Sequence, residues 1–131
     1  MINLLISGSI TFLMFKEFIT FLGTKDLEKT DDFYQHLIGL SLYKDQGVCL
    51  IFNITEQSKI GFCTHMPVIH EEKSPIITFV TEQVDELYEK LSQLGINIPD
   101  KPKANDKFNI YHFFLKDPNG YTIEIQKFLE K

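Results

Sequence analysis

The sequence contains no arginine, so all 13 of its basic residues are lysines. The chain therefore cannot form the planar, bidentate guanidinium contact that commonly recognises carboxylates and phosphates. This absence counts against glutathione thioesters and phosphonates as substrates. The 18 acidic residues outnumber the lysines, and no run of like charges is long enough to follow a phosphate backbone. We therefore expect neither a nucleic-acid partner nor a nucleotide cofactor.

Cysteine is scarce. The two cysteines, Cys49 and Cys63, each lie inside an apolar run, and their separation is not the CxxC spacing of metal and redox motifs. Cysteines in apolar surroundings are commonly buried, and intracellular thiols stay reduced. The sequence therefore predicts two buried, reduced thiols in a cytoplasmic protein.

A long hydrophobic run is also missing. Residues 1–15 carry no charged side chain, but this segment is too short to span a bilayer, lacks a basic leader, and is interrupted by Ser7, Gly8 and Ser9. No membrane association is expected. Two interpretations remain: an added pair of strands around this turn, or a dispensable extension upstream of a natural start at Met14. We favour the second, which places the folded domain at residues 14–131.

A chain of 131 residues is long enough for one domain with a single hydrophobic core. Its first half predicts a strand at residues 18–24 and a helix that Asp26 can cap and Gly39 can end. Apolar runs bounded by turn residues then predict three further strands. These strands are expected at residues 40–43, 48–54 and 59–65.

The second half repeats this order. Thr81 can cap its helix and Gly95 can end it. Its strands are expected at residues 75–81, 96–98, 108–115 and 121–128, with a polar loop at 100–107. Each half reads βαβββ, and neither can bury its sheet alone. The sequence therefore predicts an α+β fold in which two modules, about 16–66 and 74–129, pair into an open cupped mixed sheet with the helices outside.

The clearest local motif is DPNG at residues 117–120, a tight-turn sequence between two apolar runs. It predicts a β-hairpin. In the strand that follows, Ile123 and Ile125 alternate with Glu124 and Gln126. A carboxylate in mid-strand, on the face opposite two isoleucines, is a candidate functional group.

The segment FFLKDPNGYTIE at residues 113–124 resembles the closing hairpin of the vicinal oxygen chelate superfamily. That superfamily includes glyoxalase I, bleomycin- and fosfomycin-resistance proteins and extradiol dioxygenases. The resemblance covers roughly residues 16–128 and implies paired βαβββ modules, usually in a homodimer, with a small-molecule site inside the cup. It also implies that Glu124 stands at a metal-ligand position.

In this family the metal takes one ligand from the first strand of each module and one from a late strand of each. On this chain the first-strand positions fall at or beside Ile19 and near Pro75, which cannot bind a metal. The late-strand position of the first module falls at Phe62 or Cys63, and only Cys63 could be a ligand. Glu124 is then the only family ligand position clearly retained, and the usual site for Zn²⁺, Fe²⁺, Mn²⁺ or Ni²⁺ is largely lost.

A different polar set remains. Cys63 and His65 should share one strand face, and His112 should share another with Phe114, which stands where extradiol dioxygenases carry a catalytic tyrosine. If Cys63, His65 and His112 converge on Glu124, they would make a mixed site suited to Zn²⁺ or Fe²⁺. The simpler interpretation is that both histidines are hydrogen-bonded structural residues.

Two functions therefore compete. In an enzyme with metal-assisted lyase, isomerase or dioxygenase chemistry, Glu124 would act as a ligand or general base, with His112 as its proton partner. The residues expected to contact the substrate are Cys63, His65, Phe114 and Gln126. In a non-catalytic binding or resistance protein, aromatic clefts would sequester a small molecule. A filled cup would instead indicate an interaction protein. The sequence does not identify the substrate.

Overall fold

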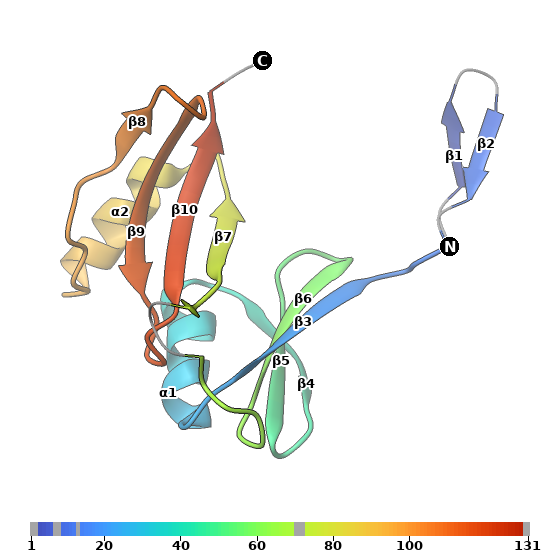
Figure 1. Ribbon diagram of the computed structural model, residues 1–131, viewed down its shortest axis with the longest axis horizontal. Helices are drawn as coiled ribbons and strands as arrows, with labels where there is room; N and C mark the ends of the chain where they lie inside the picture. The colour runs from blue at the N-terminus through green and yellow to red at the C-terminus, as the bar shows by residue number, and fades with distance from the viewer. Residues whose placement is uncertain (1–2, 7–8, 13, 70–72, 130–131) are drawn as a thin grey trace. The chain divides into compact units, whose positions relative to one another are not determined.

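The computed structural model describes residues 3–6, 9–12, 14–69 and 73–129. The chain divides into two compact units, Met1–Val68 and Ile69–Lys131, so their junction lies between the two predicted modules of about 16–66 and 74–129. Each unit contains a four-stranded mixed sheet with helix packed on one face (Figure 1).

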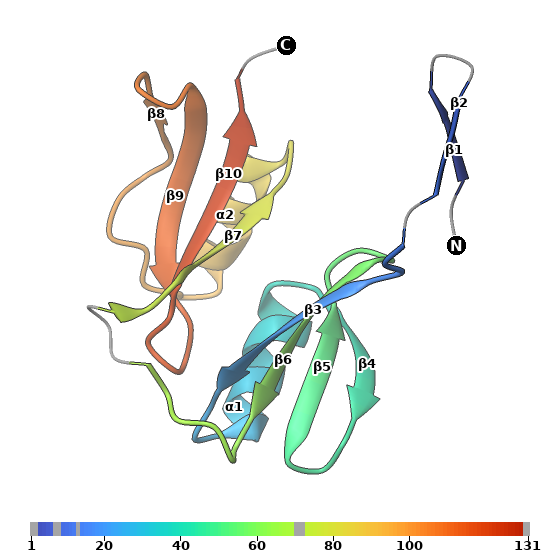
Figure 2. The same cartoon turned by 45° about the vertical axis from the view of Figure 1, so that its right-hand side comes forward.

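The first unit has the predicted order of strand, helix and three strands. Its elements are β3 (Phe18–Gly23), α1 (Leu27–Asp31), η1 (Asp32–Leu37), β4 (Ser41–Asp45), β5 (Cys49–Asn53) and β6 (Ser58–Cys63). The element η1 continues α1 with π-helical geometry. The strands lie in the order β3-β6-β5-β4, with β3 parallel to β6 and the other neighbours antiparallel (Figure 2).

The second unit has the same topology. Its elements are β7 (Ile76–Val80), α2 (Val84–Gln93), β8 (Lys103–Asn105), β9 (Ile110–Lys116) and β10 (Thr122–Phe128). The strands lie in the order β7-β10-β9-β8, with β7 parallel to β10 and the other neighbours antiparallel. Because β3 and β7 occupy equivalent places, the predicted repeat of two βαβββ modules is confirmed, and with it the α+β fold class.

Three of the four helix ends lie close to the residues that the sequence marks, but the cap predicted at Thr81 is wrong: Gln83 is the N-cap residue of α2, and the Thr81 hydroxyl accepts a hydrogen bond from the Gln83 backbone N–H at 3.1 Å. Asp26 caps α1, and its Oδ1 accepts a hydrogen bond from the Lys29 backbone N–H at 3.0 Å. Gly39 and Gly95, which follow the two helical segments, have φ values of 95° and 84°, a conformation that glycine adopts at low cost. No helix in the described part of the chain is long and apolar enough to cross a membrane.

In the first unit, an aromatic cluster holds the helix on the sheet. The fully buried ring of Tyr34 on η1 lies 4.5 Å from that of Phe62 and 6.0 Å from that of Phe52, centroid to centroid. Successive side chains of a strand point to opposite faces. Because Phe52 and Phe62 face the helix, Cys49 on β5 and Cys63 on β6 lie on the opposite face of this sheet.

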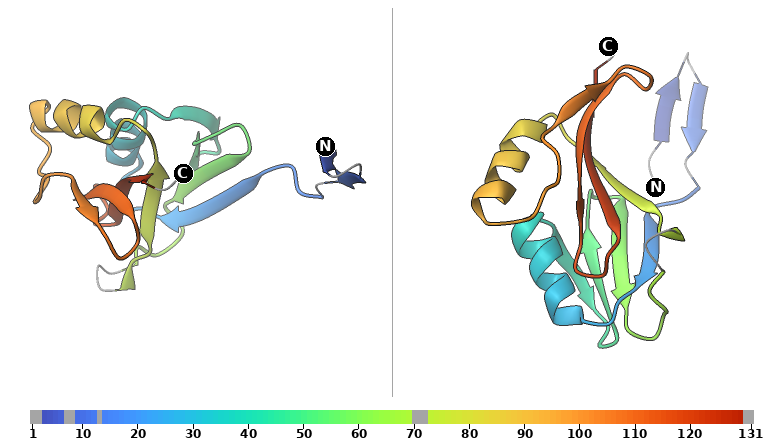
Figure 3. Two further views of the ribbon diagram at one scale, coloured as in Figure 1. Left: turned by 90° about the horizontal axis from the view of Figure 1, so that it is seen from above. Right: turned by 60° about the vertical axis from the view of Figure 1, so that its left-hand side comes forward.

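The second unit packs α2 on its sheet in the same way (Figure 3). Tyr88 on α2 meets Phe113 on β9 edge to face, with ring centroids 5.5 Å apart, and Ile123 and Ile125 of β10 are fully buried. These residues define the helix-covered face. Glu124 therefore lies on the opposite face, as the alternation in the sequence predicts.

One strand is misplaced by the sequence analysis. The prediction of a strand at residues 96–98 is wrong, because these residues form no strand, and the predicted loop at 100–107 contains β8. The physical reason is the pair Pro99 and Pro102, which have no backbone N–H to give to a ladder. Pairing with β9 therefore begins only at Lys103.

At the N-terminus, β1 (Asn3–Ile6) and β2 (Ser9–Phe12) form a separate antiparallel two-stranded sheet. This is the added strand pair that the sequence analysis left open as an alternative. The turn at residues 7–8 lies outside the described residues. A two-stranded hairpin alone is marginally stable in water, so its presence leaves the prediction of a dispensable segment in place.

We expect deletion of residues 1–13 to lower the melting temperature by less than about 8 °C, on the order of 1–2 kcal/mol for a domain of this size. The reason is that the hairpin belongs to neither four-stranded sheet. Thermal denaturation of the full chain and of a chain starting at Met14 checks this. A larger loss would mean that the hairpin is an integral part of the domain.

A hydrogen bond between α2 and β9 makes the stability of the second unit change with pH in the alkaline range. The Tyr111 hydroxyl donates to Asp85 Oδ1 at 2.6 Å. This bond, with smaller effects of burial and of the Asp85 charge, raises the pKa of Tyr111 above its usual value of 10.0. A raised folded-state pKa stabilises the fold below pH 10.0 and loses that effect as the pH rises through the folded-state value.

We therefore expect Tyr111→Phe to lower the melting temperature by about 2 °C near neutral pH, as an exposed hydrogen bond allows. The difference from the unmodified chain should shrink as the pH rises above 10.0, where the phenol loses its proton. Paired melting curves at about pH 8 and about pH 11 measure it. A difference that stays constant with pH would contradict the assignment.

Candidate functional site

The uncovered face of the second unit's sheet forms an open cavity of about 640 Å³. This volume lies within the range typical of small-molecule sites. All the residues that line it belong to the second unit, and aromatic and aliphatic side chains alternate with a few polar ones. They are Ile76, Lys103, Asn105, Phe108, Ile110, His112, Phe114, Glu124, Gln126 and Phe128.

His112 and Glu124 meet in this cavity because of the register of the last hairpin. Gln126 is the cross-strand partner of His112, and Phe114 is the partner of Glu124. The two polar residues are therefore diagonal neighbours on one face, within reach of long side chains. His112 Nδ1 lies 2.6 Å from Glu124 Oε2, and both side chains are largely buried.

Both carboxylate oxygens of Glu124 have partners. The Thr78 hydroxyl on β7 donates to Oε1 at 2.7 Å, while Oε2 faces His112 Nδ1. An ionised carboxylate can only accept hydrogen bonds, so Nδ1 of His112 carries the proton in this contact. In the neutral imidazole, Nε2 is then the nitrogen with a lone pair. The arrangement selects the tautomer that can accept a proton at Nε2.

The other residues predicted for this site also line the cavity. Phe114, 40% exposed, contacts the His112 ring edge to face with centroids 4.9 Å apart. Gln126 is buried beside its cross-strand partner His112. The hairpin thus brings together Glu124, His112, Phe114 and Gln126 as one group.

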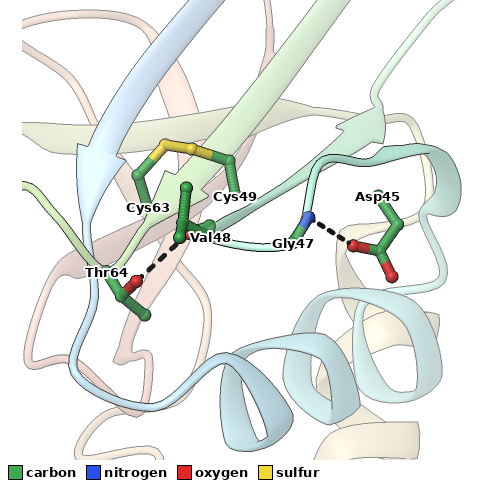
Figure 4. The surroundings of a disulfide bond; sticks show 6 residues. All are labelled: Asp45, Gly47, Val48, Cys49, Cys63 and Thr64. Carbon is green, nitrogen blue, oxygen red and sulfur yellow. Dashed lines mark hydrogen bonds between the residues drawn. A yellow bond between two sulfur atoms is a disulfide. The ribbon is translucent and has the colours of Figure 1, made fainter.

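The remaining two predicted residues belong to the first unit. Cys63 is bonded to Cys49 in a disulfide, so the prediction of reduced thiols is wrong for this structure (Figure 4). The physical reason is register, since the two cysteines are direct cross-strand partners on β5 and β6. His65 lies beyond the end of β6, in the turn that follows it, and not on a strand as predicted. The structure therefore places Cys63 and His65 beside Cys49, in a different unit from His112 and Glu124.

The sequence profile of the Glyoxalase/Bleomycin resistance protein/Dioxygenase superfamily matches residues 17–125. The chain belongs to this superfamily. The fold that this membership implies is the one described above.

Several solved structures share this fold. A glyoxalase/bleomycin resistance protein/dioxygenase from Nocardioides is 20% identical, with a TM-score of 0.71 over 92% of this chain and 87% of that one. Lactoylglutathione lyase from Agrobacterium tumefaciens is 18% identical, with a TM-score of 0.67 over 84% of this chain and 91% of that one. A virulence protein from Salmonella typhimurium is 20% identical, with a TM-score of 0.67 over 90% of this chain and 99% of that one. At these identities the likeness concerns the fold alone. The comparison with curated proteins gave no significant match.

The hydrogen bonds also establish which positions of the superfamily's repeat correspond. Thr24 N donates to Cys63 O at 3.0 Å in the first unit, and Thr81 N donates to Gln126 O at 2.9 Å in the second. Cys63 is thus equivalent to Gln126. Gly61 lies two residues before Cys63 on β6, and Glu124 lies two residues before Gln126 on β10. Glu124 is therefore equivalent to Gly61, and not to Phe62 or Cys63 as the sequence analysis proposed.

The neighbouring first-strand positions follow from the same register. Phe21 pairs with Gly61 and Thr78 pairs with Glu124, slightly further along each strand than Ile19 and Pro75, which also have no ligating side chain. Neither Phe21 nor Gly61 has a ligating side-chain atom, and Thr78 offers only a hydroxyl, which already donates to Glu124. The residues present therefore do not fit the four-ligand metal site of the superfamily.

Several residues of the cavity, and Thr78, which holds Glu124, were not predicted. Thr78 could have been found, because a parallel pairing of β7 with β10 places it beside Glu124. Lys103 and Asn105 lie on β8, the strand that the sequence analysis assigned to a loop. Phe108 and Phe128 carry no local signal of a site, because only the strand pairing of the folded sheet brings them to the cavity.

Proposed function

We propose that this protein binds a small, partly apolar molecule in the cavity of its second unit and moves a proton on it, as an isomerase or lyase does. The single observation that carries this function is the 2.6 Å contact of His112 Nδ1 with Glu124 Oε2 inside an aromatic-lined cavity. A histidine held by a buried carboxylate is a common arrangement for a general base.

In this proposal, His112 Nε2 accepts the proton from the substrate. Glu124 keeps the imidazole in the required tautomer and stabilises the imidazolium that forms. Thr78 holds the other carboxylate oxygen, so the Glu124 side chain is oriented from two sides. The later return of the proton from the imidazolium to a different substrate atom would complete an isomerisation or an elimination.

The cavity lining indicates the substrate class. Phe108, Phe114 and Phe128 can contact a flat apolar group, while Lys103 and Gln126 supply a cation and an amide for an oxygen-bearing group. A small enolisable carbonyl compound with an aromatic substituent has both features. Its C–H bond next to the carbonyl is acidic enough for a histidine base to act on.

We propose that this chemistry proceeds without a resident divalent metal, because Ile19, Phe21 and Gly61 of the first unit offer no ligating side-chain atom at or beside the positions where the superfamily's metal site needs ligands. Both oxygens of Glu124 are also already bound by neighbouring side chains. Dioxygenase chemistry, which needs a bound metal, is therefore not part of the proposal.

Proton abstraction can be tested directly by isotope exchange. We expect the protein to accelerate the exchange of the methylene protons of phenylpyruvate or phenylacetaldehyde in deuterated water, followed by proton NMR. Compounds without an aromatic group should exchange more slowly at equal concentration. Binding without accelerated exchange across a panel of such carbonyl compounds would instead favour the sequestration function.

We also propose that the protein forms a homodimer in the cytoplasm, as the sequence analysis expects for this superfamily. Sedimentation equilibrium across a range of concentrations tests the dimer, and cell fractionation tests the location. A monomer at micromolar concentration, or recovery outside the cytoplasmic fraction, would contradict the respective part.

A further inference from the structure

The first unit carries a second group of reactive side chains. The sulfur atoms of Cys49 and Cys63 and a ring nitrogen of His65 all lie within 4.8 Å of one another. Within the described residues, this is the one cluster of at least three histidine, cysteine, aspartate or glutamate side chains close enough to hold one ion. It is built entirely from the first unit, whereas the cavity of the proposed function is built from the second.

We propose that Cys49, Cys63 and His65 form a metal site for Zn²⁺ when the disulfide is reduced, and that the disulfide closes this site. Two thiolates and one imidazole are a donor set that favours Zn²⁺ over the oxygen-seeking Mg²⁺ and Ca²⁺. A water molecule would complete a tetrahedral coordination sphere.

The distances suit such a site. Zn–S bonds of about 2.3 Å and Zn–N bonds of about 2.0 Å at tetrahedral angles place donor atoms roughly 3.5 Å apart. The three donors already lie inside the 4.8 Å limit, so rotation of the side chains can bring them to these separations. The strand register holds both cysteines on one face of the sheet at the same level, and four further residue pairs of the same two strands, from Leu50–Phe62 to Asn53–Lys59, fix that register.

Burial suits the site as well. Cys63 is 1% exposed and Cys49 5% exposed, while His65 is exposed in the turn after β6. Two buried thiolates would be costly without a counter-charge, and a divalent cation neutralises both. The exposed imidazole gives the ion a path from solvent to the sulfurs. Hydrogen bonds tie the chain on both sides of the pair: Gly47 N donates to Asp45 Oδ1, and the Thr64 hydroxyl donates to Val48 O (Figure 4).

A trialkylphosphine can supply the two electrons that open the Cys49–Cys63 disulfide. A trialkylphosphine attacks one sulfur and breaks the S–S bond, and water then supplies the oxygen of the phosphine oxide and the two protons of the thiols. The disulfide is reduced by two electrons, and the phosphine is oxidised by two. Binding of the divalent ion then releases both thiol protons to solvent and forms two metal–sulfur bonds.

Cobalt(II) is a suitable probe because its absorption reports its ligands. The full chain, reduced with tris(2-carboxyethyl)phosphine under nitrogen and titrated with Co²⁺, should develop thiolate-to-cobalt charge-transfer absorption and the visible bands of a tetrahedral ion. One equivalent of Zn²⁺ should abolish these bands. Protein with the disulfide intact should not develop them.

Variants assign the ligands. Cys63→Ser and Cys49→Ser should lose the charge-transfer band. His65→Gln, at an exposed position where folding is not at risk, should weaken Co²⁺ binding by at least about tenfold. His36→Gln is the matched control, because His36 is an exposed histidine of the same unit that pairs with Asp32 at 3.4 Å. It should bind Co²⁺ as the unmodified chain does.

Three results would overturn the proposal. The first is a reduced chain without charge-transfer absorption, and the second is equal absorption in the oxidised chain. The third is His65→Gln binding Co²⁺ as tightly as His36→Gln. Circular dichroism of each variant before titration shows that the fold is retained, so that lost binding reports the missing ligand.

Discussion

Replacement of Gly23 by alanine is expected to lower the free energy of unfolding by about 3 kcal/mol or more, a large effect for one methyl group. Gly23 ends β3, and a Cβ atom built there would lie 2.2 Å from the Pro67 carbonyl oxygen and 2.5 Å from that of Met66. Both are backbone atoms, so no side-chain rotation can relieve the overlap. The segment that follows β6 would have to move away from the strand.

Gly47→Ala is the matched control for this change. Gly47 has a φ of 83°, and no atom outside Gly47 and its two chain neighbours lies within 4 Å of the position that a Cβ would take, so only the left-handed conformation opposes alanine there. We expect a cost of about 1 kcal/mol at this position. Urea denaturation of both variants measures the difference. Equal losses of unfolding free energy in the two variants would show that the backbone at Met66 and Pro67 moves away from residue 23 at little cost.

The second large effect concerns the site. We expect Glu124→Gln and His112→Gln each to reduce proton exchange on the carbonyl substrates by at least about 100-fold, the usual contribution of a positioned acid or base. The glutamine at 124 keeps the shape of the side chain, but it has no charge to stabilise an imidazolium at His112. The glutamine at 112 removes the base itself.

The double variant should be little worse than either single variant, because residues that act as one unit have non-additive effects. Glu89→Gln is the control, since Glu89 is an exposed carboxylate on α2, the helix that covers the other face of the sheet. It should exchange protons as the unmodified chain does. Melting curves should show that Glu124→Gln remains folded.

A pure binding protein would behave differently. It would show no exchange in any variant, and Glu124→Gln would change the dissociation constant for a bound aromatic carbonyl compound by about tenfold or less, as for the loss of one hydrogen bond. Full exchange activity in His112→Gln would contradict the role given to the histidine. The same set of variants thus separates catalysis from sequestration.

Much of this fold could be predicted because its signals are local. The helix cap at Asp26, the positive-φ glycines at 39 and 95, and the turn at 117–120 depend on a few adjacent residues, and each is found where predicted. The repeat of these signals in the two halves was enough to predict two βαβββ modules. The strand at 103–105 was missed because it is short and is defined by its pairing with β9, which no local pattern records.

The residues of the site also differ in whether a local sequence pattern could predict them. The contact of His112 with Glu124 follows from the alternation on two strands joined by a tight turn, so its geometry could be expected. Thr78, which contacts Glu124, and Lys103 and Phe108, which line the cavity, come from strands and loops that reach the site only after the sheet forms. Their catalytic or binding roles stay predictions.

By itself, the sequence determined the family, the two modules and the residues of the last hairpin, because turn chemistry and strand alternation act over a few residues. Only the tertiary structure decided which residues meet between strands far apart in the chain. It paired Cys49 with Cys63, made Glu124 equivalent to Gly61, and placed Phe21 beside Gly61. The physical reason is register: a shift of one residue reverses which face a side chain occupies, and that shift is settled by the packing of whole sheets.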